Sequence, residues 1–267
     1  MSSTPQLLAD KHLLITGVVN TESIAYATAA AAVRAGADIV LSGLERDIEL
    51  TRGAAAALEA DVGTSVDVLV VDLTVPEQLD ALGHDLRERW GRLDGALHAV
   101  AFAPREALAG DFLEAGIDSV ARAFHASVYT YSALARLLGD LAPATGAALV
   151  GLDFDASRAW PNYNWMGVCK SALESTNRYV ARDLGPQAIR SNLIAAGPLR
   201  TRAAGAIKGF DLLTSAWEHQ SPMAWDAEDA RPVADAAIFL LSDLSRMVTG
   251  EILHVDGGFH AMAAHLS

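Results

Sequence analysis

The chain has 267 residues, a net charge of −13 and 51% hydrophobic residues. This length suits one large α/β domain or two small ones, and the apolar content is enough for a single core. The dispersed negative charge disfavours nucleic acid and anionic membranes as partners, because both require basic patches. No apolar stretch reaches the ~18 residues of a membrane span, and the N-terminus lacks a signal-peptide pattern. A single cysteine, Cys169, fits a reducing compartment, so we expect a cytoplasmic protein.

Short apolar runs alternate with longer amphipathic stretches along the whole chain. The runs predict strands at residues 12–16, 38–42, 66–71, 95–100, 147–152, 190–195 and 251–255. The amphipathic stretches predict helices at roughly 23–35, 47–60, 76–90, 117–140, 165–184 and 230–242. This alternation, with several strands apolar throughout, predicts a single Rossmann-type doubly wound domain over residues 1–267. Its seven-stranded parallel sheet would carry helices on both faces.

The turn after the first predicted strand lies where a dinucleotide's pyrophosphate would bind. Gly17 ends the strand and Ser23 opens an alanine-rich helix, although the G-x-G-x-x-G pattern is absent. Free N–H groups and the helix dipole at a helix N-terminus favour an anion, and the Ser23 hydroxyl can add a hydrogen bond. An ordinary strand–turn–helix with Ser23 as its N-cap remains open.

Positions after the second and third predicted strands suit an adenosine. Leu44 and Glu45 follow the second strand, where an acidic side chain accepts from a ribose hydroxyl and repels a 2′-phosphate. Arg46 argues the other way, since an arginine can bind that phosphate; NADH is the favoured cofactor. Asp72 after the third strand suits an acceptor for the adenine amino group or, equally, a helix cap.

Residues 197–222 show no clear period and follow the sixth predicted strand. In an open α/β sheet this segment lies over the carboxyl ends of the strands, so we expect it to be the substrate-binding loop. Met223 and Trp225 beyond it either line the acyl crevice or anchor the loop.

Tyr163 and Lys170 stand out because the chain has only three lysines. On a regular helix a spacing of seven returns to within ~20° of the same face after a rise of ~10 Å, so both side chains can line one groove. A carbonyl reductase commonly uses a closer Tyr-x-x-x-Lys pair, in which the lysine lowers the tyrosine pKa. A wider spacing suits hydride transfer to the β-carbon of an enoyl thioester, whose carbonyl lies two carbons away. A core tyrosine and an exposed lysine remain the structural alternative.

Three motifs carry a resemblance to a known family. They are DFDASRAWPNYNWMGVCKSALES (153–175), RSNLIAAGPLRT (190–201) and HVDGGF (254–259). Together with ITGVVNTESIAYA near the N-terminus and LDGALHAVAFAP (93–104), they closely resemble the NADH-dependent enoyl-acyl carrier protein reductases. These enzymes form a divergent branch of the short-chain dehydrogenase/reductase family, and the resemblance covers nearly the whole chain.

The resemblance implies a role for individual residues. Tyr163 would donate to the thioester carbonyl, Lys170 would bind the nicotinamide ribose, and Phe154 would border the hydride path. The implied cofactor-binding residues are Gly17, Ser23, Ile24, Leu44, Asp72, Leu73, Val100, Ala101, Lys170, Leu199 and Thr201. The implied substrate-binding residues are Tyr163, Phe102, Ala103 and Met166.

The sequence departs from the family's pattern at three places. Asp153 stands where many members carry a second active-site tyrosine, and Ala101 stands where the strand-four motif usually has glycine. The 200–222 segment is shorter than the substrate loop of the long-chain specialist, which favours short-to-medium acyl chains. A homotetramer is implied by the resemblance alone.

The expected reaction is NADH-dependent reduction of the trans-2 double bond of an enoyl thioester of acyl carrier protein or coenzyme A, in fatty acid synthesis. A ketoreductase and a catalytically degenerate NAD(H)-binding sensor are the alternatives. Arg200, Arg202 and Lys208 are candidates to receive the acidic carrier protein. The histidines form no metal-binding pattern, so no metal site is expected. His98 and His125 fall near strand ends and either approach the pocket or are structural.

Overall fold

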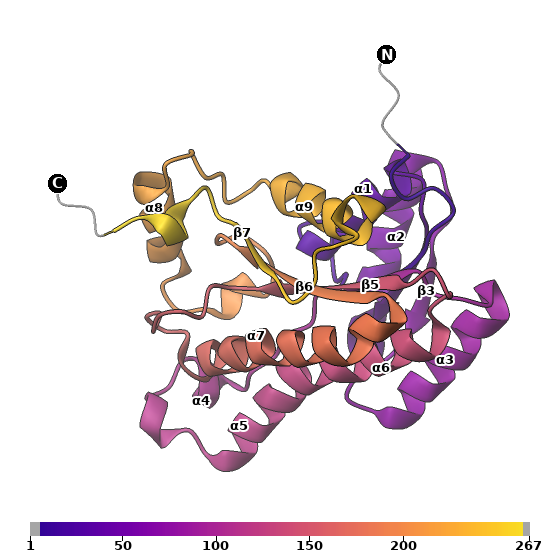
Figure 1. Ribbon diagram of the computed structural model, residues 1–267. Helices are drawn as coiled ribbons and strands as arrows, with labels where there is room; N and C mark the ends of the chain where they lie inside the picture. Colours follow the sequence, from indigo (N-terminus) through magenta and orange to yellow (C-terminus); the bar gives the residue numbers. More distant parts are fainter. Residues whose placement is uncertain (1–5, 264–267) are drawn as a thin grey trace.

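The computed structural model describes residues 6–263 and contains one parallel sheet flanked by two layers of helices (Figure 1). The strand order is β3-β2-β1-β4-β5-β6-β7. The strands are β1 (His12–Thr16), β2 (Asp38–Gly43), β3 (Asp67–Val70), β4 (Gly95–His98), β5 (Ala147–Asp153), β6 (Ile189–Ala196) and β7 (Ile252–Val255). All neighbouring strands pair in parallel. The predicted seven-stranded Rossmann-type sheet is therefore confirmed.

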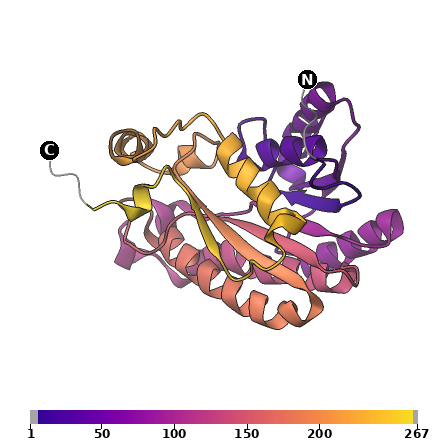
Figure 2. The same ribbon diagram turned by 45° about the horizontal axis from the view of Figure 1, so that its top comes forward.

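The long helices divide between the two faces of the sheet (Figures 1 and 2). One face carries α1 (Ile24–Arg34), α2 (Ile48–Val62) and α9 (Arg231–Leu241). The other carries α3 (Pro76–Trp90), α6 (Thr130–Leu141) and α7 (Asn164–Leu184). The three remaining α-helices of the described residues are α4 (Arg105–Leu108), α5 (Ile117–Phe124) and α8 (Phe210–Gln220). Among residues 6–263, no helix is both long and apolar enough to cross a membrane.

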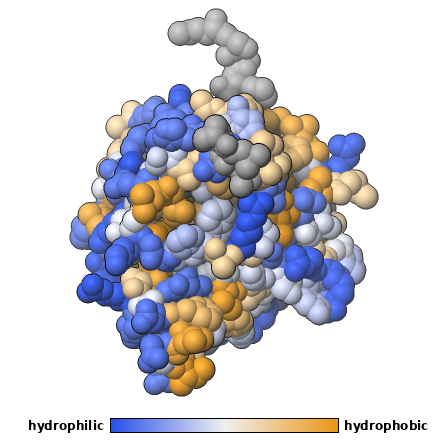
Figure 3. All heavy atoms as spheres, turned by 90° about the vertical axis from the view of Figure 1, so that its left-hand side faces the viewer, coloured by the Kyte–Doolittle hydropathy of each residue, from blue (hydrophilic) through white to orange (hydrophobic). Residues whose placement is uncertain are grey.

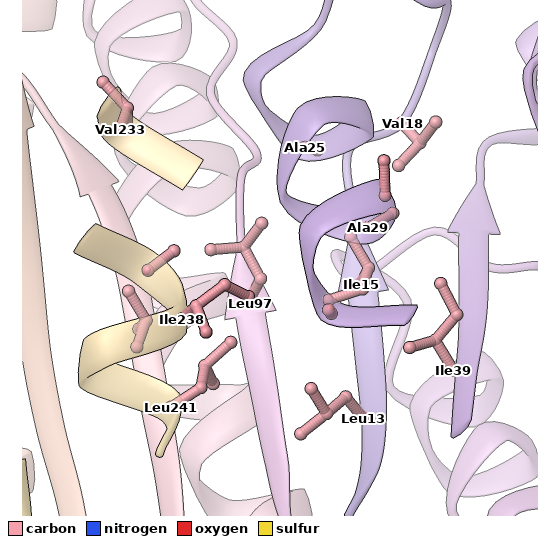
Figure 4. Packing of buried hydrophobic residues seen from close by; sticks show 14 of the residues in the cluster. Leu13, Ile15, Val18, Ala25, Ala29, Ile39, Leu97, Val233, Ile238 and Leu241 are labelled. Atoms are coloured by element: carbon pink, nitrogen blue, oxygen red, sulfur yellow. The ribbon is translucent and has the colours of Figure 1, made fainter. Parts of the chain in front are cut away.

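Each face of the sheet has its own hydrophobic core. Figure 4 shows part of the first, where aliphatic side chains of β1, β2 and β4 meet α1 and α9. The alanines of α1, such as Ala25 and Ala29, let that helix approach the sheet closely. On the opposite face, leucines of α3 and α6 pack around fully buried Tyr131. Each buried leucine or isoleucine contributes about 1.5–3 kcal/mol, so these layers hold the strand ends, and any site there, in place.

Two predicted elements differ from the observed ones. The helix expected over 117–140 is divided by a π-helical turn, His125–Tyr129, between α5 and α6. The segment expected to lack regular structure, 197–222, contains α8. The sequence of α8 shows no clear helical period because apolar residues lie on both of its faces: Leu212 is 75% exposed, whereas Trp217 is 1% exposed. The positions of apolar residues therefore do not predict which face of α8 is buried.

The order of the strands fixes where a ligand can bind. β1 lies between β2 and β4, so the chain leaves β1 in one direction and later returns to pair β4 on its other side. This reversal opens a crevice at the carboxyl ends of β1 and β4, the usual ligand site of a doubly wound sheet.

Candidate active site

Two adjoining cavities open at the carboxyl ends of the strands. The tyrosine cavity, of about 420 Å³, is lined by Tyr163 and Lys170. The Asp72 cavity, of about 440 Å³, lies beyond it. Gly17 and the Ala99–Phe102 segment line both. A wider depression of about 900 Å³ between α1 and α9 includes none of the predicted site residues. The crevice at the switch point is therefore the candidate site.

The turn after β1 packs tightly against the backbone that follows β4. Gly17 has a φ of +80°, and a Cβ there would lie 2.1 Å from the carbonyl oxygen of Ala99, so only glycine fits. The hydroxyl of Thr51 fixes the turn by donating to the Val18 carbonyl at 2.8 Å. Beyond the turn, the first N–H groups of α1 have no partner within the helix, and such groups favour an anion.

Ser23 is the N-cap of α1, which confirms the alternative of an ordinary strand–turn–helix at this position. Its hydroxyl oxygen accepts from the Tyr26 N–H at 3.2 Å and its proton goes to the Asn20 carbonyl at 2.9 Å. The side chain still lines the tyrosine cavity, together with Ile24. Because the hydroxyl proton is already used, the backbone of this turn is the better anion binder.

Tyr163 reaches the tyrosine cavity by a sharp turn of the backbone rather than by helical spacing. It is the residue before α7, and its neighbours Asn162 and Asn164 both have positive φ values of 59° and 42°. The backbone between Tyr163 and Lys170 is therefore not a regular helix throughout, but the two side chains line the same cavity, as the spacing predicts. The Tyr163 ring is 8% exposed and packs edge-on against Phe154, with 5.2 Å between ring centroids.

The Tyr163 phenol is a neutral hydrogen-bond donor throughout the ordinary pH range. Burial raises its pKa well above the usual value, and the carboxyl of Asp153 raises it further. Since Lys170 does not offset this shift, the lysine does not act here by making the tyrosine more acidic.

Lys170 and Asp153 form a buried pair beside the tyrosine. The Lys170 Nζ donates to the Leu152 carbonyl at 2.8 Å and lies 3.9 Å from Asp153 Oδ1. Burial lowers the pKa of Lys170, and the carboxyl of Asp153 opposes that shift. Burial also raises the pKa of Asp153 to about 7, against the effect of Lys170. In the sequence, Asp153 is notable only because it departs from a family pattern. No feature of the sequence predicts that it is buried.

A protein-family model described as enoyl-(acyl carrier protein) reductase matches residues 17–260. The chain belongs to this family. A curated relative, the NADH enoyl-[acyl-carrier-protein] reductase of Mycolicibacterium smegmatis, is 38% identical over 94% of this chain and 97% of its own length. The corresponding enzymes of Rhizobium meliloti and Escherichia coli are 37% and 36% identical, over 98% and 96% of this chain and 94% and 96% of their own lengths. The family inferred from the motifs is confirmed.

In this enoyl reductase the Asp72 cavity has the character expected for an adenosine site. Leu44, Asp72 and Leu73 line it. Oδ1 of Asp72 accepts from the Thr74 N–H at 2.9 Å and from the Thr74 hydroxyl at 2.6 Å. This arrangement stiffens the turn after β3 and holds the carboxylate at the cavity wall.

Glu45 does not line either cavity, contrary to the sequence expectation. A short 3₁₀ turn, Glu45–Asp47, leaves Glu45 exposed, and Arg46 and Asp47 line the Asp72 cavity instead. Asp47 lies 3.3 Å from Arg46 and 3.4 Å from Arg202, measured between the charged atoms. The acidic side chain at the wall of the Asp72 cavity is therefore Asp47 and not Glu45.

The remaining wall of the tyrosine cavity is mainly apolar. The other predicted residues that line it are Val100, Ala101, Phe102, Ala103, Phe154, Met166, Leu199 and Thr201. Residues Ile207, Phe210 and Leu213 of the 197–222 segment close the opposite side. Figure 3 faces the side of the molecule that carries α4 and α8, and shows apolar patches separated by polar atoms.

The other candidates divide clearly between structure and site. His98 is buried, its Nε2 lies 2.8 Å from the Thr130 hydroxyl, and burial lowers its pKa to about 3. His125 is exposed and lines the Asp72 cavity. Trp225 anchors the loop by donating to the Pro198 carbonyl at 2.8 Å, whereas Met223 is 73% exposed and lines neither cavity.

Proposed function

We propose that this enoyl reductase transfers a hydride from NADH to C3 of a trans-2-enoyl thioester of acyl carrier protein or coenzyme A. The observation that carries the proposal is the shared cavity of Tyr163 and Lys170, which adjoins the Gly17 turn and has an otherwise apolar wall. NADH, when bound, supplies the hydride. Everything else in the reaction falls to the side chains that bind and orient the two molecules.

Tyr163 stabilises the reaction by donating its hydrogen bond to the thioester carbonyl oxygen. As the hydride reaches C3, negative charge develops on that oxygen, and a fixed donor in a dry cavity lowers the energy of the enolate. The raised pKa of Tyr163 keeps the proton on the phenol, so the group acts as a donor without releasing its proton. C2 is then protonated, ultimately from solvent.

The residues of the two cavities fit the parts of NADH in order. Leu44, Asp72 and Leu73 hold the adenosine, and the Gly17 turn with the N-terminus of α1 holds the pyrophosphate. The Lys170 ammonium binds the nicotinamide ribose. Asp47 disfavours the 2′-phosphate of NADPH, but the neighbouring Arg46 and Arg202 reduce that effect, so the preference for NADH rests on a balance of charges.

The 197–222 segment acts as the substrate-binding loop of a single catalytic domain. Its Ile207, Phe210 and Leu213 meet the acyl chain in a cavity that must also hold the nicotinamide. A volume of about 420 Å³ for both suits short-to-medium acyl chains.

The carrier protein and the subunit arrangement are the remaining parts of the proposal. Arg200 is paired with Asp211 and Glu228, and Arg202 with Asp47. Lys208 is exposed and makes no ion pair among residues 6–263, so it is the better placed to meet an acidic carrier. A cytoplasmic homotetramer, about four times the 28.1 kDa chain, completes the proposal and is testable by light scattering.

Oxidation of NADH with crotonyl-CoA, compared with acetoacetyl-CoA, tests the function. Turnover of the enoyl substrate alone supports an enoyl reductase. Turnover of only the keto substrate would identify a ketoreductase instead, and NADH binding without either reaction would identify a sensor.

A further inference from the structure

The turn that carries Tyr163 has two asparagines in the left-handed region of the backbone. Asn162 has a φ of 59° and Asn164 has a φ of 42°. Asparagine tolerates this region better than most side chains, but the conformation is still unfavourable. Such conformations persist only where surrounding contacts hold them, and they are concentrated at active sites. The contacts that hold this turn therefore matter for the role of Tyr163.

Only one of the two asparagines is bonded through its side chain to another part of the chain that the structure describes. The Asn164 Nδ2 donates to the Gly110 carbonyl at 2.6 Å. The Asn162 side chain is exposed and makes no hydrogen bond with residues 6–263. The residue after Asn164 adds a second bond, because the Trp165 Nε1 donates to the Phe112 carbonyl at 3.0 Å. The rings of Trp165 and Phe112 also stack, with 4.9 Å between their centroids.

The segment that accepts these bonds is itself close to the site. We call residues 110–112 the brace. It follows α4, which lies against α7 (Figure 1). Leu108, at the end of α4, lines the tyrosine cavity and packs in the same small cluster of buried side chains as Tyr163. The bond from Asn164 to the brace therefore links two walls of one cavity, directly after the tyrosine.

We propose that Asn164 is a positioning residue, whose bond to the brace holds the Tyr163 phenol where it can donate to the thioester carbonyl. This inference rests on the proposed function. Tyr163 precedes α7, so the direction of its side chain depends on the backbone of the turn and on the packing of the ring. A displacement of about 1 Å in a reacting group can lower a rate about 100-fold. Loss of the bond should therefore lower kcat and leave the binding of NADH unchanged.

Three variants separate the hydrogen bond from the backbone conformation. Asn164→Gly removes the bond and still permits a positive φ. Asn164→Asp keeps the size of the side chain but replaces its donor by an acceptor. Asn162→Gly is the matched control, because it makes the same change at the other left-handed position, where no side-chain bond is lost. With crotonyl-CoA and NADH, kcat should fall at least about tenfold in both Asn164 variants and stay within about twofold in Asn162→Gly.

A double-mutant cycle with Tyr163→Phe distinguishes positioning from a general loss of structure. Once the phenol hydroxyl is absent, its position no longer affects the reaction. Adding Asn164→Gly to Tyr163→Phe should therefore lower kcat by less than about twofold. Losses that multiply in the double variant would overturn the proposal, because they would show that Asn164 acts on something other than Tyr163. The same cycle with Asn164→Asp decides the question if Asn164→Gly does not fold.

The dissociation constant of NADH, measured by fluorescence, gives the second readout. It should stay within about twofold in Asn164→Gly, since the Gly17 turn and Lys170 are unchanged, and a rise of more than about tenfold would contradict a role through Tyr163 alone. If the wild-type chain does not reduce crotonyl-CoA, the proposed function fails. If it does and Tyr163→Phe is impaired, but both Asn164 variants match Asn162→Gly, only the positioning role fails.

Discussion

Replacing Tyr163 by phenylalanine removes one hydroxyl group from the centre of the tyrosine cavity. The ring is 8% exposed and packs against Phe154, and phenylalanine keeps that packing. No hydrogen bond joins the Tyr163 hydroxyl to another described residue, and no such bond contributes to its raised pKa. The substitution therefore leaves no protein group without its partner.

The expected loss falls on the reaction and not on the fold. A donor to a developing oxyanion is worth about 10²–10³ in kcat, or roughly 3–4 kcal/mol. The free energy of unfolding should change by less than about 1 kcal/mol, because neither packing nor an internal hydrogen bond is lost. The dissociation constant of NADH should stay within about twofold, since Lys170 and the Gly17 turn are untouched.

Steady-state oxidation of NADH with crotonyl-CoA gives kcat, and urea unfolding gives the stability. Tyr179→Phe is the matched control, because Tyr179 lies on α7 but is 58% exposed and lines neither cavity. It should leave kcat unchanged. A loss in Tyr163→Phe of less than about threefold, or one equal to that of the control, would refute the assigned role.

Three further predictions follow from the site. Lys170→Ala should raise the dissociation constant of NADH at least about tenfold by removing a charged donor, whereas Lys11→Ala, whose lysine pairs with Asp243 at 3.1 Å, should not; equal effects would contradict the assignment. Gly17→Ala should lower the free energy of unfolding in urea by about 3 kcal/mol, because its Cβ meets a backbone oxygen at a positive φ. Gly53 lies inside α2 with no atom near the position of a Cβ, so Gly53→Ala should raise the free energy of unfolding by about 0.5–1 kcal/mol. A Gly17→Ala variant as stable as Gly53→Ala, or more stable, would be inconsistent with the turn described. Among enoyl-CoA substrates of increasing length, kcat/KM should peak at short-to-medium chains, and a clear preference for very long chains would disprove the proposed size of the crevice.

The sheet was predictable because most residues of β1, β2, β4, β5 and β6 are buried, so these strands appear as apolar runs in the sequence. The helix predicted at 76–90 matches α3 residue for residue, since Pro76 and the αL residue Gly91 mark its ends. The π-helical turn His125–Tyr129 was not predictable. Its i→i+5 bonds depend on packing against other elements and leave no period in the sequence.

The site was predictable as a set of positions and not as a geometry. All the catalytic, cofactor-binding and substrate-binding residues implied by the family resemblance line one of the two cavities, but Glu45 does not. Tyr163 arrives there through a turn flanked by two asparagines with positive φ. Asp47 takes the place expected for Glu45, because a 3₁₀ turn redirects the chain. In the sequence, Asp153 could be identified only as a departure from the family motif. Its burial and its lack of hydrogen-bond partners are properties of the folded chain and could not be predicted.

The position of the transferred hydride tests the central claim most directly. NADH carrying deuterium at C4 of the nicotinamide is allowed to react with crotonyl-CoA, and the product is examined by mass spectrometry and NMR. The proposed arrangement of Tyr163 and Lys170 predicts saturated butyryl-CoA with deuterium at C3. Deuterium on a carbinol carbon formed from a keto substrate, with none transferred to crotonyl-CoA, would contradict it.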